Sequence, residues 1–245
     1  MRSLWLVLSY WLAVQAVAGP RVVSLAPHTT ELVIAAGGID LLVGAVPADR
    51  PLPHRVTALY NYGGIDREHL LTLQPDLIVV WTSGTRPADL AWLGSLDIRL
   101  YASEPSSLDD IAEDIHALGR LMNTREAADT AATRFLTAVN TPCTTLPPLK
   151  VYIEIWPHPP LSLGGRHWLN DVLRHLGLHN TFAETERAVF TPDPETLLQR
   201  THLPHLVLRD TPSAHGHLGS TLLARPGPRL AEALPSLCHQ RLNVE

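Results

Sequence analysis

Aromatic side chains gather in the stretch 60–81 of this 245-residue chain, where Tyr60 and Tyr62 precede a glycine pair and Trp81 follows an apolar run. Flat aromatic groups bury large apolar ligand surfaces at small entropic cost. The apolar run reads as a buried parallel strand, so Trp81 stands at its carboxyl end, where α/β proteins bind ligands. We therefore expect Tyr62 and Trp81 in a ligand cleft, and Tyr60 either there or in the core.

Two stretches share a pattern of an acid at a helix start, a leucine pair, a proline and a buried strand. The first has Glu68, Leu70-Leu71 and Pro75, and the second has Glu195, Leu197-Leu198 and Pro204. We expect both leucines of each pair to face a sheet. The acids suit the positive end of a helix dipole, which leaves two interpretations open: plain helix-start acids, or contacts for a cationic partner.

Catalytic motifs are absent from the sequence. It has no Gly-x-Ser-x-Gly elbow, no His-Glu-x-x-His helix and no phosphate-binding glycine loop. Its 13 histidines form no tight cluster with acids. We therefore predict no enzyme, no metal site and no cofactor. His28 follows the apolar strand 21–25, so we expect it to face the cleft or cap a helix, and an approach to a metal in the ligand stays open.

Strands and helices alternate over 21–103 and again after residue 150, which is typical of α/β layers with parallel sheets. Helices are predicted at 31–36, capped by Thr29 or Thr30, and at 108–122, opened by Ser107 with Asp110. A 125–140 helix capped by Thr124 leads to a proline-rich break. The predicted fold class is α/β, with two Rossmann-like lobes at 19–122 and 142–245 joined by one long helix at 123–141. The Pro/Gly stretch 157–165 is predicted to be a loop.

The first 18 residues have the pattern of a signal peptide: Arg2, an apolar run too short to span a membrane, and small residues at 16–18. We expect cleavage, export to the periplasm and no membrane insertion afterwards. A net charge of −5 argues against nucleic acid as a partner. In an oxidising compartment Cys143 and Cys238 either form a disulfide, which would stabilise by roughly 4 kcal/mol, or remain two thiols.

Several segments carry a resemblance to a known family. RVVSLAPHTTELVIAAG, YGGIDREHLLTLQPDLIVVW, GLHNTF and RPGPRLAEAL resemble the periplasmic vitamin B12-binding proteins of ABC importers. These belong to the broader family of binding proteins with a helical backbone, which also take ferric siderophores and haem. The resemblance covers essentially the whole mature chain and implies two lobes, a stiff connecting helix and a ligand between the lobes.

The resemblance also implies roles for individual residues. Tyr62 and Trp81 stand where the family places cleft tryptophans, and Trp156 is placed to face the ligand. Glu68 and Glu195 match the two glutamates, one per lobe, that dock on arginines of the membrane permease.

The sequence departs from the family pattern at three places. A cleft tyrosine is replaced by Pro47 or Ala48, and a cleft tryptophan by Val189 or Phe190. The short segment 210–217 lacks a helix and strand that the family usually has, so we expect a trimmed second lobe. The implied function is transport: a monomer that captures cobalamin or another corrinoid and delivers it to an ABC importer permease. A siderophore or haem carrier and, in another class, a periplasmic enzyme are the alternatives.

Overall fold

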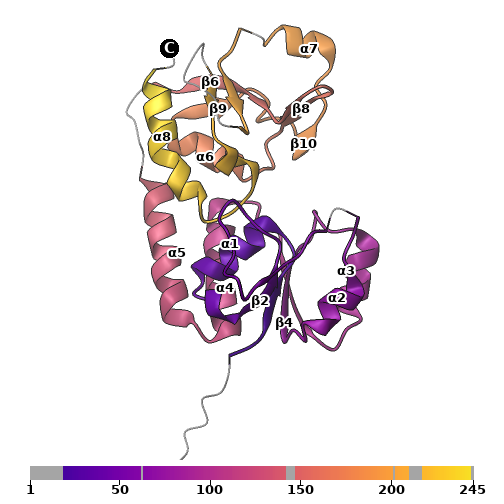
Figure 1. Ribbon diagram of the computed structural model, residues 1–245. Coiled ribbons are helices and arrows are strands. Elements are labelled where there is room, and N and C mark those ends of the chain that lie inside the picture. The colour runs from indigo at the N-terminus through magenta and orange to yellow at the C-terminus, as the bar shows by residue number, and fades with distance from the viewer. Residues whose placement is uncertain (1–18, 62, 142–146, 201, 210–216, 244–245) are drawn as a thin grey trace, which may run out of the picture.

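Two α/β lobes lie one above the other in the computed structural model, with α5 (Arg125–Asn140) along the first lobe and α8 (Leu230–Leu242) along the second (Figure 1). The structure describes residues 19–61, 63–141, 147–200, 202–209 and 217–243. The predicted fold class is confirmed. Within these ranges no helix combines the length and the apolar character that crossing a membrane requires.

The first lobe is built on a five-stranded parallel sheet in the order β3-β2-β1-β4-β5. Alternate residues of its central strands face opposite sides, as a strand's period of two requires. Val22 and Val79 pack under α1 and α4, whereas Val23 and Ile78 belong to a second core that includes Leu70 of α2. The bounds are β1 (Val22–Ser24), α1 (Pro27–Ala35), β2 (Leu42–Ala45), β3 (Thr57–Ala58), α2 (Arg67–Thr72), β4 (Leu77–Trp81), α3 (Pro87–Gly94), β5 (Arg99–Ser103) and α4 (Leu108–Met122), with a 3-10 turn at Ile39–Leu41.

Helix α1 begins four residues earlier than predicted. Its N-cap is Ala26 and its first residue is Pro27, whose fixed φ angle and missing N–H suit that position. Thr29 closes the first turn from inside the helix, because its Oγ1 accepts a hydrogen bond from the Ala26 N–H at 3.1 Å. The prediction of a Thr29 or Thr30 cap is therefore wrong. Gly37, at φ +83°, follows the end of the helix.

Helices α4 and α5 (Arg125–Asn140) pack against each other as an antiparallel pair. The capping box of Ser107 and Asp110 is confirmed, with the Ser107 hydroxyl accepting from the Asp110 N–H at 3.1 Å. Thr124 occupies the N-cap position of α5, but its side chain does not cap that helix. Its Oγ1 instead donates to the Ala36 carbonyl at 2.6 Å, which ties the start of α5 to the end of α1.

The second lobe has a four-stranded parallel sheet in the order β12-β11-β6-β9 and a small antiparallel sheet in the order β10-β8-β7. Residues 157–165 are not a continuous loop, because β7 and β8 form a hairpin there. Pro157 lies on the edge strand and Pro160 opens its strand, the two positions where a sheet tolerates proline. The bounds are β6 (Leu149–Glu154), β7 (Trp156–Pro157), β8 (Pro160–Leu163), α6 (Leu169–His175), β9 (Leu178–Asn180), β10 (Val189–Phe190), α7 (Pro194–Leu198), β11 (His205–Val207), β12 (His217–Gly219) and α8 (Leu230–Leu242), with a 3-10 turn at Thr221–Ala224.

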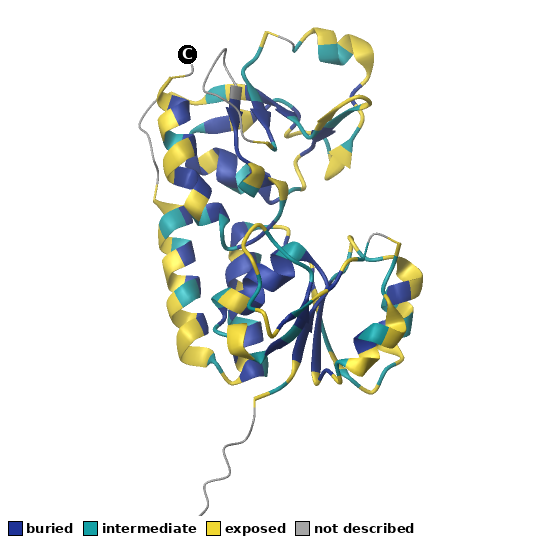
Figure 2. Ribbon diagram, viewed as in Figure 1, coloured by how far each residue is buried: buried dark blue, intermediate teal, exposed yellow. Residues whose placement is uncertain are grey.

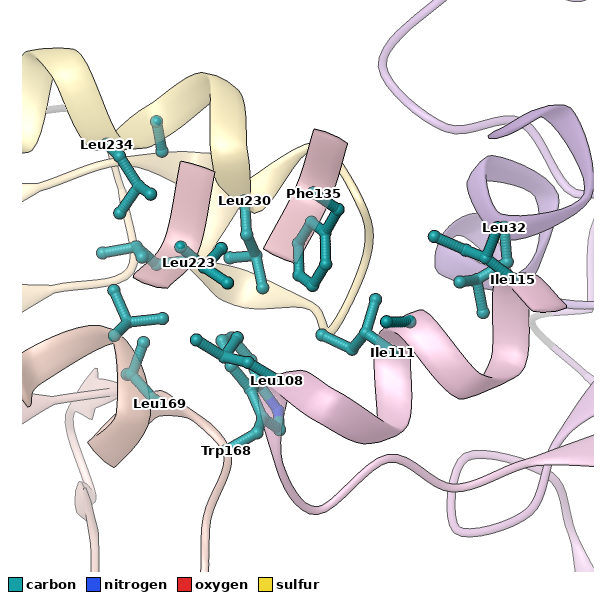
Figure 3. Packing of buried hydrophobic residues seen from close by; sticks show 14 of the residues in the cluster. Leu32, Leu108, Ile111, Ile115, Phe135, Trp168, Leu169, Leu223, Leu230 and Leu234 are labelled. Carbon is teal, nitrogen blue, oxygen red and sulfur yellow. The ribbon is translucent and has the colours of Figure 1, made fainter. Parts of the chain in front are cut away.

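One hydrophobic core runs through both lobes. Leu32 of α1 and Ile111 of α4 belong to the same buried cluster as Trp168, Leu169 of α6 and Leu234 of α8. Figure 3 shows these side chains as a continuous row across the junction, and Figure 2 shows buried residues on both sides of it. The junction between the lobes is therefore packed with apolar side chains.

Candidate functional site

The ligand-site prediction centres on the point where the first sheet changes direction. The chain leaves β1 toward β2 and leaves β4 toward β5, so the carboxyl ends of the adjacent strands β1 and β4 mark a topological switch point. Trp81 is the last residue of β4, and His28 is the second residue of the helix that follows β1. Their rings meet edge to face, with centroids 5.1 Å apart and an interplanar angle of 89°.

The Trp81 ring folds back over the turn that follows its strand. A Cβ atom added at Gly84 would lie 1.8 Å from Cε3 of this ring, so any other residue at that position would displace the indole. The ring is only partly buried. Trp81 is thus held on one side by Gly84 and His28, and part of it stays accessible.

His28 is almost completely enclosed, with 1% of its surface exposed. Burial, with the nearby Arg225 guanidinium, lowers the pKa of His28 to about 4. The imidazole is therefore neutral near pH 7, and its buried Nε2 has no hydrogen-bond partner among the described residues. The N-cap of α1 is Ala26 and not His28. The expectation that His28 caps this helix is therefore wrong.

The two aromatic residues predicted for the second-lobe side of the cleft, Trp156 and Phe190, lie on the small antiparallel sheet. Phe190 on β10 packs edge to face on the buried Phe182, with ring centroids 5.1 Å apart. Its neighbour Val189 is 46% exposed. Trp156 on β7 is 58% exposed, and its Nε1–H donates to the His158 carbonyl at 2.9 Å.

The predicted aromatic residues form separate groups. The ring contacts that involve these predicted residues include His28 with Trp81 and Phe190 with Phe182, and each of the two contacts lies within one lobe. Tyr60 is 64% exposed, so the core alternative for it is wrong. It lines a hollow of about 290 Å³ next to α2. Tyr62 lies outside the described residues.

A polar hollow of about 520 Å³ between the lobes was missed by the sequence analysis. The first lobe contributes Ser106 and Ser107, and the second contributes polar groups that include His167 and Asn180. The glycine pair at 164–165 is the signal that could have located it. A Cβ at Gly165 would lie 2.2 Å from the Ala183 carbonyl oxygen, so a glycine is needed where these two backbone segments meet beside the hollow.

A cluster of ion pairs joins the lobes at another place. Glu31 of α1 and Asp49 belong to the first lobe, and both lie within ion-pair distance of Arg225 and Arg229 of the second. Glu31 is buried, with 6% of its surface exposed. Burial raises the pKa of the Glu31 carboxyl, while the two arginines oppose that shift. A hydrogen bond from Arg225 lowers the pKa of Asp49.

An apolar cavity of about 530 Å³ lies behind this ion cluster, between α1, α5 and the start of α8. Its lining includes Ile34, Phe135 and Pro228, and among the described residues none of the aromatic side chains predicted to bind a ligand. We therefore do not place the ligand there.

The two acids predicted to dock on a partner occupy equivalent positions. Glu68 and Glu195 are each the second residue of a short helix, and both are exposed. The N-cap of α2 is Asp66, whose carboxylate accepts from the His69 N–H at 3.0 Å. The N-cap of α7 is Asp193, which accepts from the Thr196 N–H at 2.8 Å. Helices α2 and α7 both lie on the side of the molecule away from α5 (Figure 1).

Only one leucine of each pair turns inward. Leu70 is 1% exposed and packs in the core of the first lobe, and Leu197 is partly buried. Leu71 and Leu198 are instead 45% and 71% exposed. The expectation that both leucines of each pair face the sheet is wrong, because two adjacent residues of a helix point about 100° apart.

Cys238 lines none of the hollows described above. Cys238 on α8 is disulfide-bonded, and Cys143, the other cysteine of the sequence, lies outside the described residues. In the described part of the chain, no three histidine, cysteine or acidic residues are arranged to hold a metal ion.

Residues 22–215 match the family model described as "Periplasmic binding protein". The chain belongs to this family. Among curated relatives, the binding protein is 30% identical to the Vitamin B12-binding protein of Vibrio cholerae over 246 residues, which cover 89% of this chain and 87% of the relative. It is also 30% identical to the Vitamin B12-binding protein of Yersinia pseudotuberculosis, with 95% and 90% of the two chains covered.

Solved structures of periplasmic binding proteins share the fold. The crystal structure of the periplasmic Vitamin B12 binding protein of Vibrio cholerae matches with a TM-score of 0.77 at 28% identity, covering 91% of this chain and 97% of the other. The periplasmic heme binding protein of Vibrio cholerae matches with a TM-score of 0.73 at 18% identity, covering 89% and 98%. The second likeness concerns the fold alone.

Proposed function

We propose that this periplasmic binding protein captures cobalamin or a related corrinoid between its two lobes and delivers it to the permease of an ABC importer. The observation that carries the ligand assignment is the position of Trp81, partly accessible at the switch point of the first sheet. A corrinoid is a broad, mostly apolar disc with amide arms. An indole face suits the disc, and the hydroxyl groups of Ser106 and Ser107 beside the interlobe hollow suit the arms.

The relatives support this ligand over the alternatives. The curated proteins at 30% identity are named for vitamin B12, whereas the haem-binding likeness is one of fold at 18% identity. The remaining parts of the proposal are a periplasmic location, a monomeric state, the permease as partner and no catalytic activity of its own. They rest on the family and on the signal-peptide pattern of residues 1–18.

Separate binding assays with three ligands test the ligand assignment. Purified mature protein is mixed in turn with cyanocobalamin, a ferric siderophore and haem, and each mixture is run on gel filtration with detection of the ligand's colour. We expect cobalamin alone to elute with the protein. Retention of haem or siderophore without cobalamin would overturn the ligand assignment and leave the family assignment unchanged. Elution of all three ligands separately from the protein would overturn the proposed binding function itself.

A further inference from the structure

The outward leucines of α2 and α7 stand at the same distance from the two glutamates. Leu71 follows Glu68 by three residues, and Leu198 follows Glu195 by three residues. All four residues lie inside their helices. Residues three apart share one face of a helix, so each lobe presents a carboxylate and a leucine side by side.

A single exposed leucine on a protein surface requires no explanation. Three leucines of the described residues are largely exposed, namely Leu71, Leu198 and Leu242, and two of them occupy the equivalent position beside a glutamate. Each of these two leucines follows an inward leucine. One member of each pair therefore packs against its lobe, and the other is exposed to solvent.

We propose that Leu71 and Leu198 are apolar contacts of a docking surface for the importer, each seated next to the ion pair that its neighbouring glutamate forms. The proposal rests on the function proposed above. The partner would present, at two places, a cationic side chain flanked by an apolar recess. Such a surface complements both halves of the pair, the carboxylate by charge and the leucine by burial.

The two contacts would act differently on association. A rim carboxylate steers the encounter and raises the association rate, and salt weakens it. A buried leucine is insensitive to screening and slows dissociation. The leucines are therefore expected to set how long the complex lasts.

The test uses the cobalamin importer of the same organism, reconstituted in nanodiscs, with binding followed by biolayer interferometry. The double variant Leu71→Ser with Leu198→Ser is compared with Leu242→Ser, which changes the third exposed leucine at the far end of α8. A second double variant, Leu71→Met with Leu198→Met, keeps an apolar side chain of similar volume. Cobalamin retention on gel filtration is measured for every variant.

We expect the serine double variant to weaken binding at least tenfold, on the order of 1.4 kcal/mol, mainly through faster dissociation. The ratio to wild type is expected to persist at about 1 M ionic strength, where the Debye length is about 3 Å. The methionine variant and Leu242→Ser are expected to bind as wild type does, and all variants to retain cobalamin.

Wild-type affinity in the serine double variant would overturn this inference alone, as would an equal loss in Leu242→Ser. Wild-type protein that neither binds the importer nor retains cobalamin would overturn the inference together with the proposed function.

Discussion

The imidazole of His28 stands edge-on to the indole of Trp81, with their centroids 5.1 Å apart. The contact joins the element after β1 to the end of β4, so it spans the switch point of the first sheet. His28 is buried and neutral, and it supports the tryptophan from behind without offering a charge. The accessible part of Trp81 is thus positioned by two neighbours, His28 and Gly84.

Replacing Trp81 with alanine is expected to weaken cobalamin binding by about 10- to 100-fold, because removing a buried large apolar side chain costs about 1.5–3 kcal/mol. Isothermal titration calorimetry measures the change. Trp92→Ala is the matched control, since this tryptophan lies on α3 under the Arg67 guanidinium at 4.8 Å. An equal loss of affinity in both variants would remove Trp81 from the ligand site.

Glu68→Ala combined with Glu195→Ala is expected to leave cobalamin affinity intact and abolish uptake, because both acids are exposed on helices α2 and α7. Uptake of radiolabelled cobalamin in cells lacking the native binding protein is the measurement. The control is Glu113→Ala with Glu126→Ala, which removes two exposed charges from α4 and α5. Uptake by the first double variant at the control's rate would exclude the docking role.

Acidification is expected to destabilise the protein through His28. Its folded pKa of about 4 lies below the value of about 6.5 for an unfolded chain, so the unfolded state binds the proton first. The contribution to stability is complete above pH 6.5 and is lost as the pH falls toward 4. Linkage gives a loss of about 2 kcal/mol between pH 7.5 and pH 5.

Urea unfolding of wild type and His28→Asn at these two pH values checks this prediction, and the variant should lose about 2 kcal/mol less than wild type. Burial also lowers the pKa of His167 to about 4, so His167→Asn is expected to behave in the same way. The exposed His54 supplies the control, His54→Asn. An unchanged pH dependence in His28→Asn would show that His28 accepts its proton without cost in the folded state.

The interlobe ion cluster is expected to contribute to stability through coupling. In a double-mutant cycle of Glu31→Gln and Arg225→Met, we expect a coupling energy above about 1 kcal/mol, because Glu31 is buried. The exposed pair of Arg55 and Asp40, with side chains 49% and 87% exposed, should couple by less than about 1 kcal/mol. Equal coupling in the two cycles would contradict a special role for the buried cluster.

Much of the fold followed from local sequence signals. Ser107 with Asp110 was identified as a cap because such side chains bond the first free N–H groups of a helix. Thr124 was misassigned, since nothing local indicates that its hydroxyl bonds the distant Ala36 carbonyl. The β7–β8 hairpin was missed because prolines signal a loop unless they fall at a sheet edge.

The candidate site was harder to predict because its contacts join distant parts of the chain. The position of Trp81 at a strand end is readable from an apolar run, but its contact with His28 depends on the order of the strands. The ion cluster pairs Glu31 with Arg225 across 194 positions of the printed sequence, and no periodicity reports such a pairing. The outward turn of Leu71 and Leu198 depends on the phase of very short helices, which sequence defines poorly.

The apolar row from Leu32 through Ile111 to Trp168 and Leu234 has a consequence for how the molecule melts. A lobe expressed alone would expose its half of that row, so we expect that neither lobe folds on its own. Unfolding should then be a single cooperative transition, with equal calorimetric and van 't Hoff enthalpies. A ligand held by residues of one lobe would raise the melting temperature of the entire chain.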